Sequence, residues 1–233
     1  MIVGEIGELW RYPVKSMAGE PLRTADLTRE GIPGDRAVYV VDGKERIVSA
    51  RTRPRLLAFR ATLGESGDPL VFGRPWDSPE ISHAVRLAAG SDARLVRHDG
   101  FERFDILPLL VATQGAISAL GEDRRRLRPN LTIQGAEGLA ERDWPGRSLR
   151  IGEAVIAIHS LRERCVITTF DPDTLAQDPG VLKRIYRDFG GKMALNCWVA
   201  EPGHVQVGDA VELLEGYEHQ AVPPRVDATP DPP

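Results

Sequence analysis

Four side chains beside short strand patterns are suited to binding an anion. Lys15 and Ser16 stand together in YPVKS, directly after an apolar strand pattern, while Arg36 in GDR and Arg128 in RPN each enter a later one. A lysine ammonium group binds a phosphate as a point charge, and a guanidinium binds it through a planar set of N–H donors. Each of these turns alone is typical of solvated surface. Their shared position at strand ends favours an oxyanion site.

Cys165 is the candidate for metal ligation or nucleophilic attack. It follows Arg162 and Arg164 in the segment RERC, and guanidinium neighbours favour the thiolate, which is the form that ligates or attacks. A lone free cysteine is also often a small buried apolar residue, so the residues themselves leave both interpretations open. Cys197 lies inside an apolar strand pattern and is predicted to belong to the core.

Familiar catalytic motifs do not occur in this sequence. There is no GxGxxG, P-loop, HExxH or GxSxG pattern, which argues against the common nucleotide, zinc-protease and hydrolase classes. The five histidines are scattered, and the two cysteines stand far apart at positions 165 and 197. Neither a disulfide framework nor a four-thiolate metal site is therefore expected.

Composition and charge indicate an ordinary globular protein. The chain has 233 residues, of which 42% are hydrophobic and 27% charged, and its net charge is -4. A nucleic-acid binder usually has a basic excess, so we interpret the arginine-rich stretches 46–60 and 124–128 as solvated faces and expect no nucleic-acid partner. There is no signal-peptide pattern, and the longest apolar run, 106–112, is far shorter than the ~20 residues of a membrane span. We expect a reduced, cytoplasmic protein without membrane association.

The elements that must position the candidate residues are mostly strands. Apolar patterns between turn residues predict strands at 2–10, 36–42, 46–50, 56–63, 131–134, 148–151, 154–160, 166–169, 195–200 and 205–214. Capping signals predict helices from Ser78-Pro79 to Gly90 and from Asp178-Pro179 to Gly190, and one further short helix is expected at 114–120. Many strands with few helices favour an α+β, mostly β fold built from barrels rather than a doubly wound sheet.

The order of several segments resembles a known family. LWRYPVKSMAGEPL, GIPGDRAVYVVDG and SARTRPRL resemble the N-terminal β-barrel that precedes molybdenum-cofactor sulfurase C-terminal (MOSC) domains. LRPNLTI, WPGRSLRIG, RERCVITTFDPDT and PGHVQVGDAVELL resemble the MOSC domain itself. The chain is therefore similar to bacterial relatives of the mitochondrial amidoxime-reducing component family. We expect an N-terminal barrel-like domain at 1–90 packed on a MOSC β-barrel at 91–216, with a disordered proline-rich tail at 217–233.

The resemblance implies a bound molybdenum-molybdopterin cofactor. By motif position, Cys165 corresponds to the molybdenum ligand of the family. The implied cofactor-binding residues are Lys15, Ser16, Arg36, Arg128 and Asn130, with Thr113 aligned more loosely. Asp171 and Asp173 of the DPDT segment are candidates for orienting water or protons, although a capped turn explains them equally well. Glu163 departs from the family, which often has Ser or Pro at that position, and residues 73–105 are compressed.

The implied activity is reduction of N-hydroxylated small molecules such as amidoximes, hydroxylamines and hydroxylamino-purines. No ferredoxin-like cysteine cluster is present, so electrons must come from an external flavin, haem or iron–sulfur protein. The alternative is a sulfur-carrier or cofactor-handling domain in which Cys165 accepts a persulfide. Pyridoxal phosphate is not expected, because the chain has only four lysines and no aminotransferase pattern.

Overall fold

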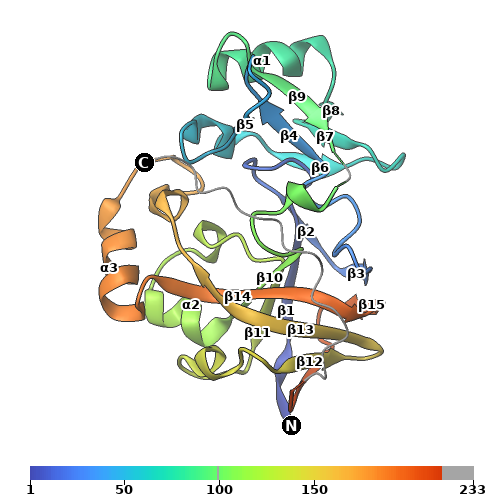
Figure 1. Ribbon diagram of the computed structural model, residues 1–233, viewed down its shortest axis with the longest axis vertical. Helices are drawn as coiled ribbons and strands as arrows, with labels where there is room; N and C mark the ends of the chain where they lie inside the picture. The colour runs from blue at the N-terminus through green and yellow to red at the C-terminus, as the bar shows by residue number, and fades with distance from the viewer. Residues whose placement is uncertain (99, 217–233) are drawn as a thin grey trace.

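A computed structural model describes residues 1–98 and 100–216. The predicted disordered tail at 217–233 lies outside these residues. A β-barrel forms one end of the molecule, and smaller sheets with one helix cover the other end (Figure 1). The fold is mostly β with short helices, which confirms the predicted class.

Seven strands close the barrel. Their order is β11-β10-β14-β13-β12-β16-β1, and β1 pairs back onto β11. Closure removes the free edges that an open sheet would expose. The strands are β1 (Ile2–Arg11), β10 (Leu109–Thr113), β11 (Leu131–Gln134), β12 (Ser148–Ile151), β13 (Ala154–Glu163), β14 (Lys192–Glu201) and β16 (Ala210–Leu214). An eighth strand, β2 (Glu20–Leu22), extends the sheet along β1.

Alternating residues fill the barrel interior. On β14, Leu195, Cys197 and Val199 are buried in the main core cluster, whereas Trp198, between them in sequence, belongs to a smaller cluster on the opposite face. Side chains of a strand point alternately to its two faces, so a strand covered on both sides is apolar at successive positions. This confirms the prediction that Cys197 is a core residue.

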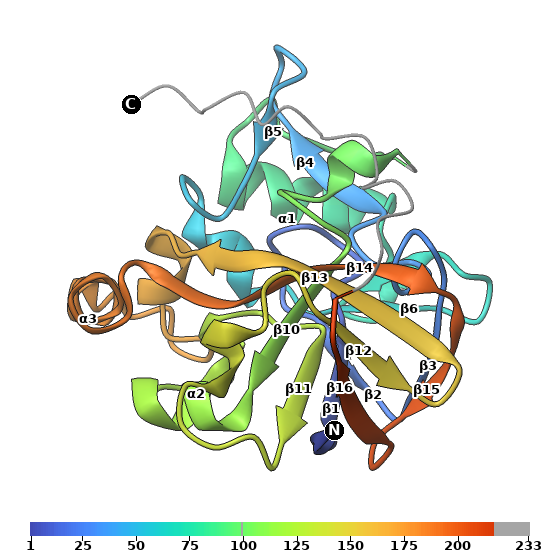
Figure 2. The same ribbon diagram turned by 60° about the horizontal axis from the view of Figure 1, so that its bottom comes forward.

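The smaller sheets are formed mainly by the N-terminal part of the chain. β4 (Val38–Val41) pairs with β5 (Ile47–Val48) and β9 (Arg94–Arg97), and β3 (Thr24–Leu27) pairs with β15 (Gly203–Gln206). A further sheet contains β6 (Ala61–Leu63), β7 (Pro69–Val71) and β8 (Arg74–Pro75). Figure 2 shows β1 among the barrel strands, although it opens the chain. The division into domains at 1–90 and 91–216 stays a prediction. Strands from the first range pair with strands from the second in the barrel (β1 with β11) and in the smaller sheets (β3 with β15, β4 with β9).

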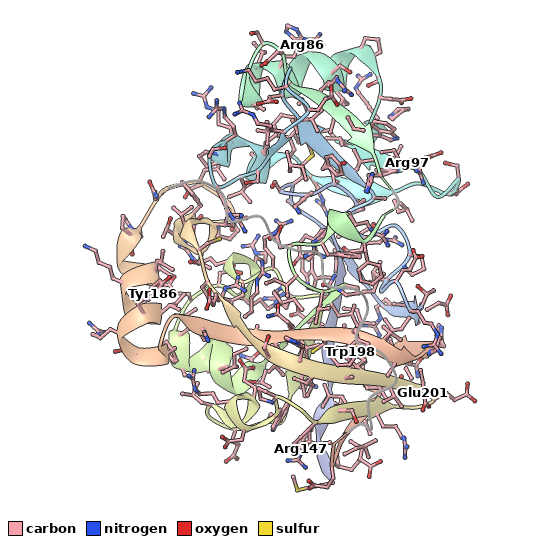
Figure 3. All side chains as sticks on the ribbon, in the orientation of Figure 1. Arg86, Arg97, Arg147, Tyr186, Trp198 and Glu201 are labelled. Atoms are coloured by element: carbon pink, nitrogen blue, oxygen red, sulfur yellow. The ribbon has the colours of Figure 1, made fainter. Side chains whose placement is uncertain are left out.

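Each of the three α-helices in the described residues follows a capping side chain, and two of these caps, Ser78 and Asp178, are the predicted ones. α1 (Pro79–Ala89), α2 (Gln114–Leu120) and α3 (Pro179–Phe189) follow Ser78, Thr113 and Asp178, and each of these side chains accepts a hydrogen bond from the first turn. Such caps satisfy backbone N–H groups that have no partner within the helix. α3 buries one side against α2 and leaves Tyr186 60% exposed on its outer face (Figure 3). The helical spacing of Val181, Leu182, Ile185, Tyr186 and Phe189 predicts that Tyr186 packs in the core with the others, which is wrong for this residue.

Three predicted strands are wrong in whole or in part. The predicted strand at 205–214 is two strands, β15 and β16, separated by a turn at 207–209. Residues 166–169 form the 3₁₀ helix η5 (Val166–Thr169), and the first part of 56–63 belongs to η1 (Pro54–Ala58). The hydroxyls of Thr168 and Thr169 donate to backbone carbonyls three residues earlier, which stabilises the tight turn over an extended strand. The remaining 3₁₀ helices are η2 (Phe101–Arg103), η3 (Arg124–Arg126) and η4 (Ala140–Asp143).

Candidate functional site

A polar cleft lies where the N-terminal sheets meet the barrel, and it contains Cys165. Its open volume is about 90 Å³. The predicted residues that line this cleft are Lys15, Ser16, Arg36, Arg128, Asn130 and Cys165. They come from segments up to 150 residues apart (Lys15 and Cys165), so the fold gathers them from both halves of the chain.

Three residues of the cleft have unusual backbone geometry. Ser16, Arg36 and Arg128 have φ values of 70°, 55° and 57°, in the left-handed region that favours glycine. Each such residue costs on the order of 1–2 kcal/mol, and strain of this kind tends to gather at functional sites. Local bonds hold the turns: the Ser16 hydroxyl accepts from the amide of Ala50 at 2.9 Å, and the Arg36 amide donates to the Tyr12 carbonyl at 2.8 Å.

One carboxylate lies among three cations at the cleft. Asp105 is 2.7 Å from the Lys15 ammonium, 2.9 Å from the Arg162 guanidinium and 3.4 Å from that of Arg51. Burial would raise the pKa of the Asp105 carboxyl, but Lys15 and Arg162 hold it well below its usual range. Lys15, Arg51 and Arg162 therefore gather around the Asp105 carboxylate.

Tyr12 lies between two of the predicted arginines. The ring centroid is 4.3 Å from the Arg128 guanidinium and 5.2 Å from that of Arg36, a spacing at which cation–π attraction operates. Burial raises the pKa of Tyr12 to about 12, and its hydroxyl donates to the Pro129 carbonyl. Burial also lowers the pKa of Arg128 to about 10, which still leaves it charged at neutral pH. Tyr12 thus orients two cations toward the cleft.

Asn130 fixes the Arg36 side of the cleft. Its amide nitrogen donates to the Trp10 carbonyl and to Asp35, and its amide oxygen accepts from the Leu110 amide. Arg36 donates to Asp35 and, at 3.4 Å, to Asn130. The amide nitrogen and the amide oxygen of buried Asn130 both have hydrogen-bond partners within the protein. Asn130 therefore acts on the cleft mainly by holding Arg36 in place.

Arg164 precedes Cys165, lines the cleft and has an incomplete set of hydrogen bonds. One terminal nitrogen donates to the Leu127 carbonyl at 2.8 Å, but Nε and Nη1 are buried without a partner among the described residues. Burial, followed by repulsion from Arg162, lowers its pKa to about 10. A buried charged donor without an acceptor is costly. The N–H groups of these two nitrogens favour binding of an anion beside the partly exposed thiol of Cys165.

Family profiles match nearly the whole chain. The profile described as "MOSC N-terminal beta barrel domain" matches residues 3–105, and the one described as "MOSC domain" matches residues 113–212. The chain belongs to the MOSC-domain family.

Named relatives and a solved structure agree with this membership. Human "Mitochondrial amidoxime-reducing component 1" is 27% identical over an alignment of 285 positions that covers 91% of this chain and 83% of the relative. Human "Mitochondrial amidoxime reducing component 2" is 27% identical, covering 74% and 68%. The YUAD protein from Bacillus subtilis has a similar fold, with a TM-score of 0.51 at 15% identity, over 92% of this chain and 97% of that one.

Three predicted site residues of this MOSC protein lie outside the cleft lining. Thr113 is fully buried, where it caps α2 and donates to Glu141 at 2.8 Å. Asp171 accepts three hydrogen bonds from its own turn, including the Thr174 amide and hydroxyl. Asp173 forms a two-pronged ion pair with Arg125 at 2.6 and 2.8 Å. The structure therefore does not bring these three to Cys165, because local capping and an ion pair occupy them.

Other members of the cleft were missed from the sequence. Asp105 carries no motif, and Arg164 was noted only as a neighbour that favours the thiolate. The signal for Arg164 is its place immediately before Cys165 in RERC.

No helix of the described part of this MOSC protein is long and apolar enough to cross a membrane.

Proposed function

We propose that this MOSC protein is a molybdenum-cofactor-dependent reductase of N-hydroxylated small molecules: amidoximes, hydroxylamines and hydroxylamino-purines. Cys165 is the molybdenum ligand in this proposal. The observation that supports it most is the placement of the Cys165 thiol in a cationic cleft, beside buried Arg164 N–H groups that have no acceptor. The relatives named as amidoxime-reducing components support the choice of substrate class.

The residues of the cleft fit the charged part of such a cofactor. A molybdopterin carries an anionic phosphate, and Lys15, Arg36, Arg128 and Arg164 provide cationic donors for it. Cysteine thiolate is a soft ligand suited to a metal of this kind. The open volume of the cleft is about 90 Å³, below the roughly 300–1,000 Å³ of typical small-molecule sites. Lys15 would contact the phosphate on release from the Asp105 carboxylate, with which it is paired at 2.7 Å.

The chain's own residues would bind and orient in this reaction. The bound cofactor supplies the two-electron chemistry by which the N–O bond of the substrate breaks, yielding the reduced nitrogen compound and water after uptake of two protons. We propose that electrons come from an external flavin, haem or iron–sulfur protein. We assign no step to Asp171 or Asp173, and we expect no pyridoxal phosphate. A cytoplasmic location remains our proposal on sequence grounds.

The test uses protein purified from a host that makes the cofactor. Molybdenum content, pterin fluorescence and amidoxime reduction are measured for the wild type, Cys165→Ser and the matched control Cys197→Ser. We expect stoichiometric molybdenum in the wild type, loss of reduction in Cys165→Ser because a hydroxyl is a poor soft-metal ligand, and retained reduction in Cys197→Ser. Wild-type protein that lacks pterin and instead accepts a persulfide on Cys165 would establish the sulfur-carrier alternative.

A further inference from the structure

A second cavity of about 450 Å³ adjoins the cleft that contains Cys165. The two share Arg128 and Ile167 in their linings. Ile167 lies in η5, two residues after Cys165, so the cavity lies against the same 3₁₀ turn as the thiol. Walls come from β1, η1, η3 and η5, hence from both halves of the chain.

The cavity has more positive charge than its own carboxylates neutralise. Among the four arginines of its lining, Arg125 is paired with Asp123 and Asp173, and Arg126 with Glu122 and Asp171. No carboxylate of the described residues lies within ion-pair distance of the remaining two, Arg60 and Arg128. Because Arg128 also lines the cleft, where the proposed function assigns it to the cofactor, Arg60 is the guanidinium of this cavity that favours an anionic ligand.

Arg60 is placed to contact such a ligand. Its backbone carbonyl accepts from the Phe72 amide at 2.9 Å, and the Ala18 amide donates to the carbonyl of neighbouring Phe59, so the segment is held on two sides. The side chain is exposed and lines the cavity, and no hydrogen bond to it occurs within the described part of the chain. It can therefore turn toward a bound anion without breaking an existing contact.

The remaining walls of the cavity are apolar and partly aromatic. They include Trp10, Leu57, Ile167 and Phe170. Leu57 and Phe170 belong to one buried cluster, with Ile167 packed against it, so these walls are rigid. Flat aromatic walls favour a planar ring. Together with Arg60, they define a site for a planar molecule that carries a negative charge.

We propose that this cavity holds the body of the substrate, and that the preferred substrates are planar N-hydroxylated compounds bearing an anionic group that Arg60 binds. This rests on the proposed function. In this arrangement the ring contacts the apolar walls, the anionic group meets Arg60, and the N-hydroxyl end points toward the cleft at Cys165.

The first measurement is binding without an electron donor, so that no turnover occurs. Calorimetry compares benzamidoxime with its para-carboxylate on the full chain purified with its cofactor. We expect the wild type to bind the carboxylate about fivefold more tightly, since an exposed ion pair contributes less than a decade of affinity. Arg60→Gln should lose this preference. Arg55→Gln removes a nearby exposed arginine that does not line the cavity, and it should keep the preference.

The second measurement is steady-state reduction of the same two compounds. Arg60→Gln should raise KM for the carboxylate about fivefold and leave kcat, KM for the neutral compound and molybdenum content unchanged. An unchanged carboxylate preference in Arg60→Gln overturns the proposal. So does a fall in molybdenum content, which would assign the cavity to the cofactor. Wild-type protein that shows the binding preference without molybdenum or reduction would overturn the proposed function alone.

Discussion

The barrel interior and the cleft differ in how completely their groups are satisfied. Around Cys197 the interior consists of interlocking apolar side chains from successive strands, and burial raises the pKa of that thiol well above its usual value. Around Cys165 the cleft has left-handed backbone, several neighbouring cations, and the buried Nε and Nη1 of Arg164, which have no acceptor in the part of the chain that the structure describes. Cys197 contributes to the stability of the fold through its packing in the core. Cys165 lies beside strained backbone and unpartnered polar groups, which lower the free energy of unfolding. Such a separation is expected when a rigid scaffold supports a site that is completed by a ligand.

The largest expected effect on stability distinguishes the two regions. Leu195→Ala in the barrel core should lower the free energy of unfolding by about 3 kcal/mol, because it leaves a cavity among close-packed strands. Arg164→Met should change it by less than about 1 kcal/mol, because it removes a buried charge that has a hydrogen bond to Leu127 but no ion pair among the described residues. Urea unfolding of the cofactor-free proteins measures both values. A larger loss in Arg164→Met than in Leu195→Ala would show that the cleft, too, stabilises the fold.

The next effect concerns how firmly the cleft holds its ligand. Arg36→Ala or Arg128→Ala should lower cofactor occupancy about tenfold, since each removes a charge-assisted hydrogen bond of roughly 1.5–3 kcal/mol. Reduction per bound molybdenum should fall much less, because these residues grip the cofactor. Molybdenum content is measured beside the rate, and Arg86→Ala on the far side of α1 is the matched control (Figure 3). Unchanged molybdenum content in both cleft variants would refute their assignment.

The smallest effect is the acid dependence of the stability that the Asp105 carboxylate contributes. Because its folded pKa lies below the unfolded value of about 4, ionised Asp105 stabilises the fold above that value, and this stabilisation is lost as pH falls through the folded pKa. The side chain is 37% exposed, so solvent screening keeps the effect modest. Asp105→Asn should therefore flatten the acid-side slope of stability.

Anion binding provides a second measurement on the same variant. Inorganic phosphate should bind Asp105→Asn more tightly than the wild type, because Lys15 and Arg162 lose their internal partner. Calorimetry near neutral pH measures this affinity. Equal affinity in the two proteins would show that Asp105 does not compete for the cationic groups.

Local sequence rules predicted the elements well where the controlling residues are neighbours. Ser78 and Asp178 start helices because a cap acts within one turn. Cys197 is predicted to belong to the core because it lies inside an apolar strand pattern, and the structure buries it. Residues 166–169 show the limit of these rules. An apolar, β-branched run resembles a strand, but threonine back-bonds and the packing of η5 on α3 produce a 3₁₀ turn.

The sequence by itself determined the order of the elements, the family and the identity of the residues that now meet around Cys165. Only the tertiary structure decided that Asp105 lies among Lys15, Arg51 and Arg162, and that Thr113, Asp171 and Asp173 are occupied elsewhere. It also decided that β1 closes the barrel against β11 and β16. The physical reason is distance along the chain. Capping and alternation act within a few residues, whereas ion pairs and barrel closure join segments that come together only when the whole core packs.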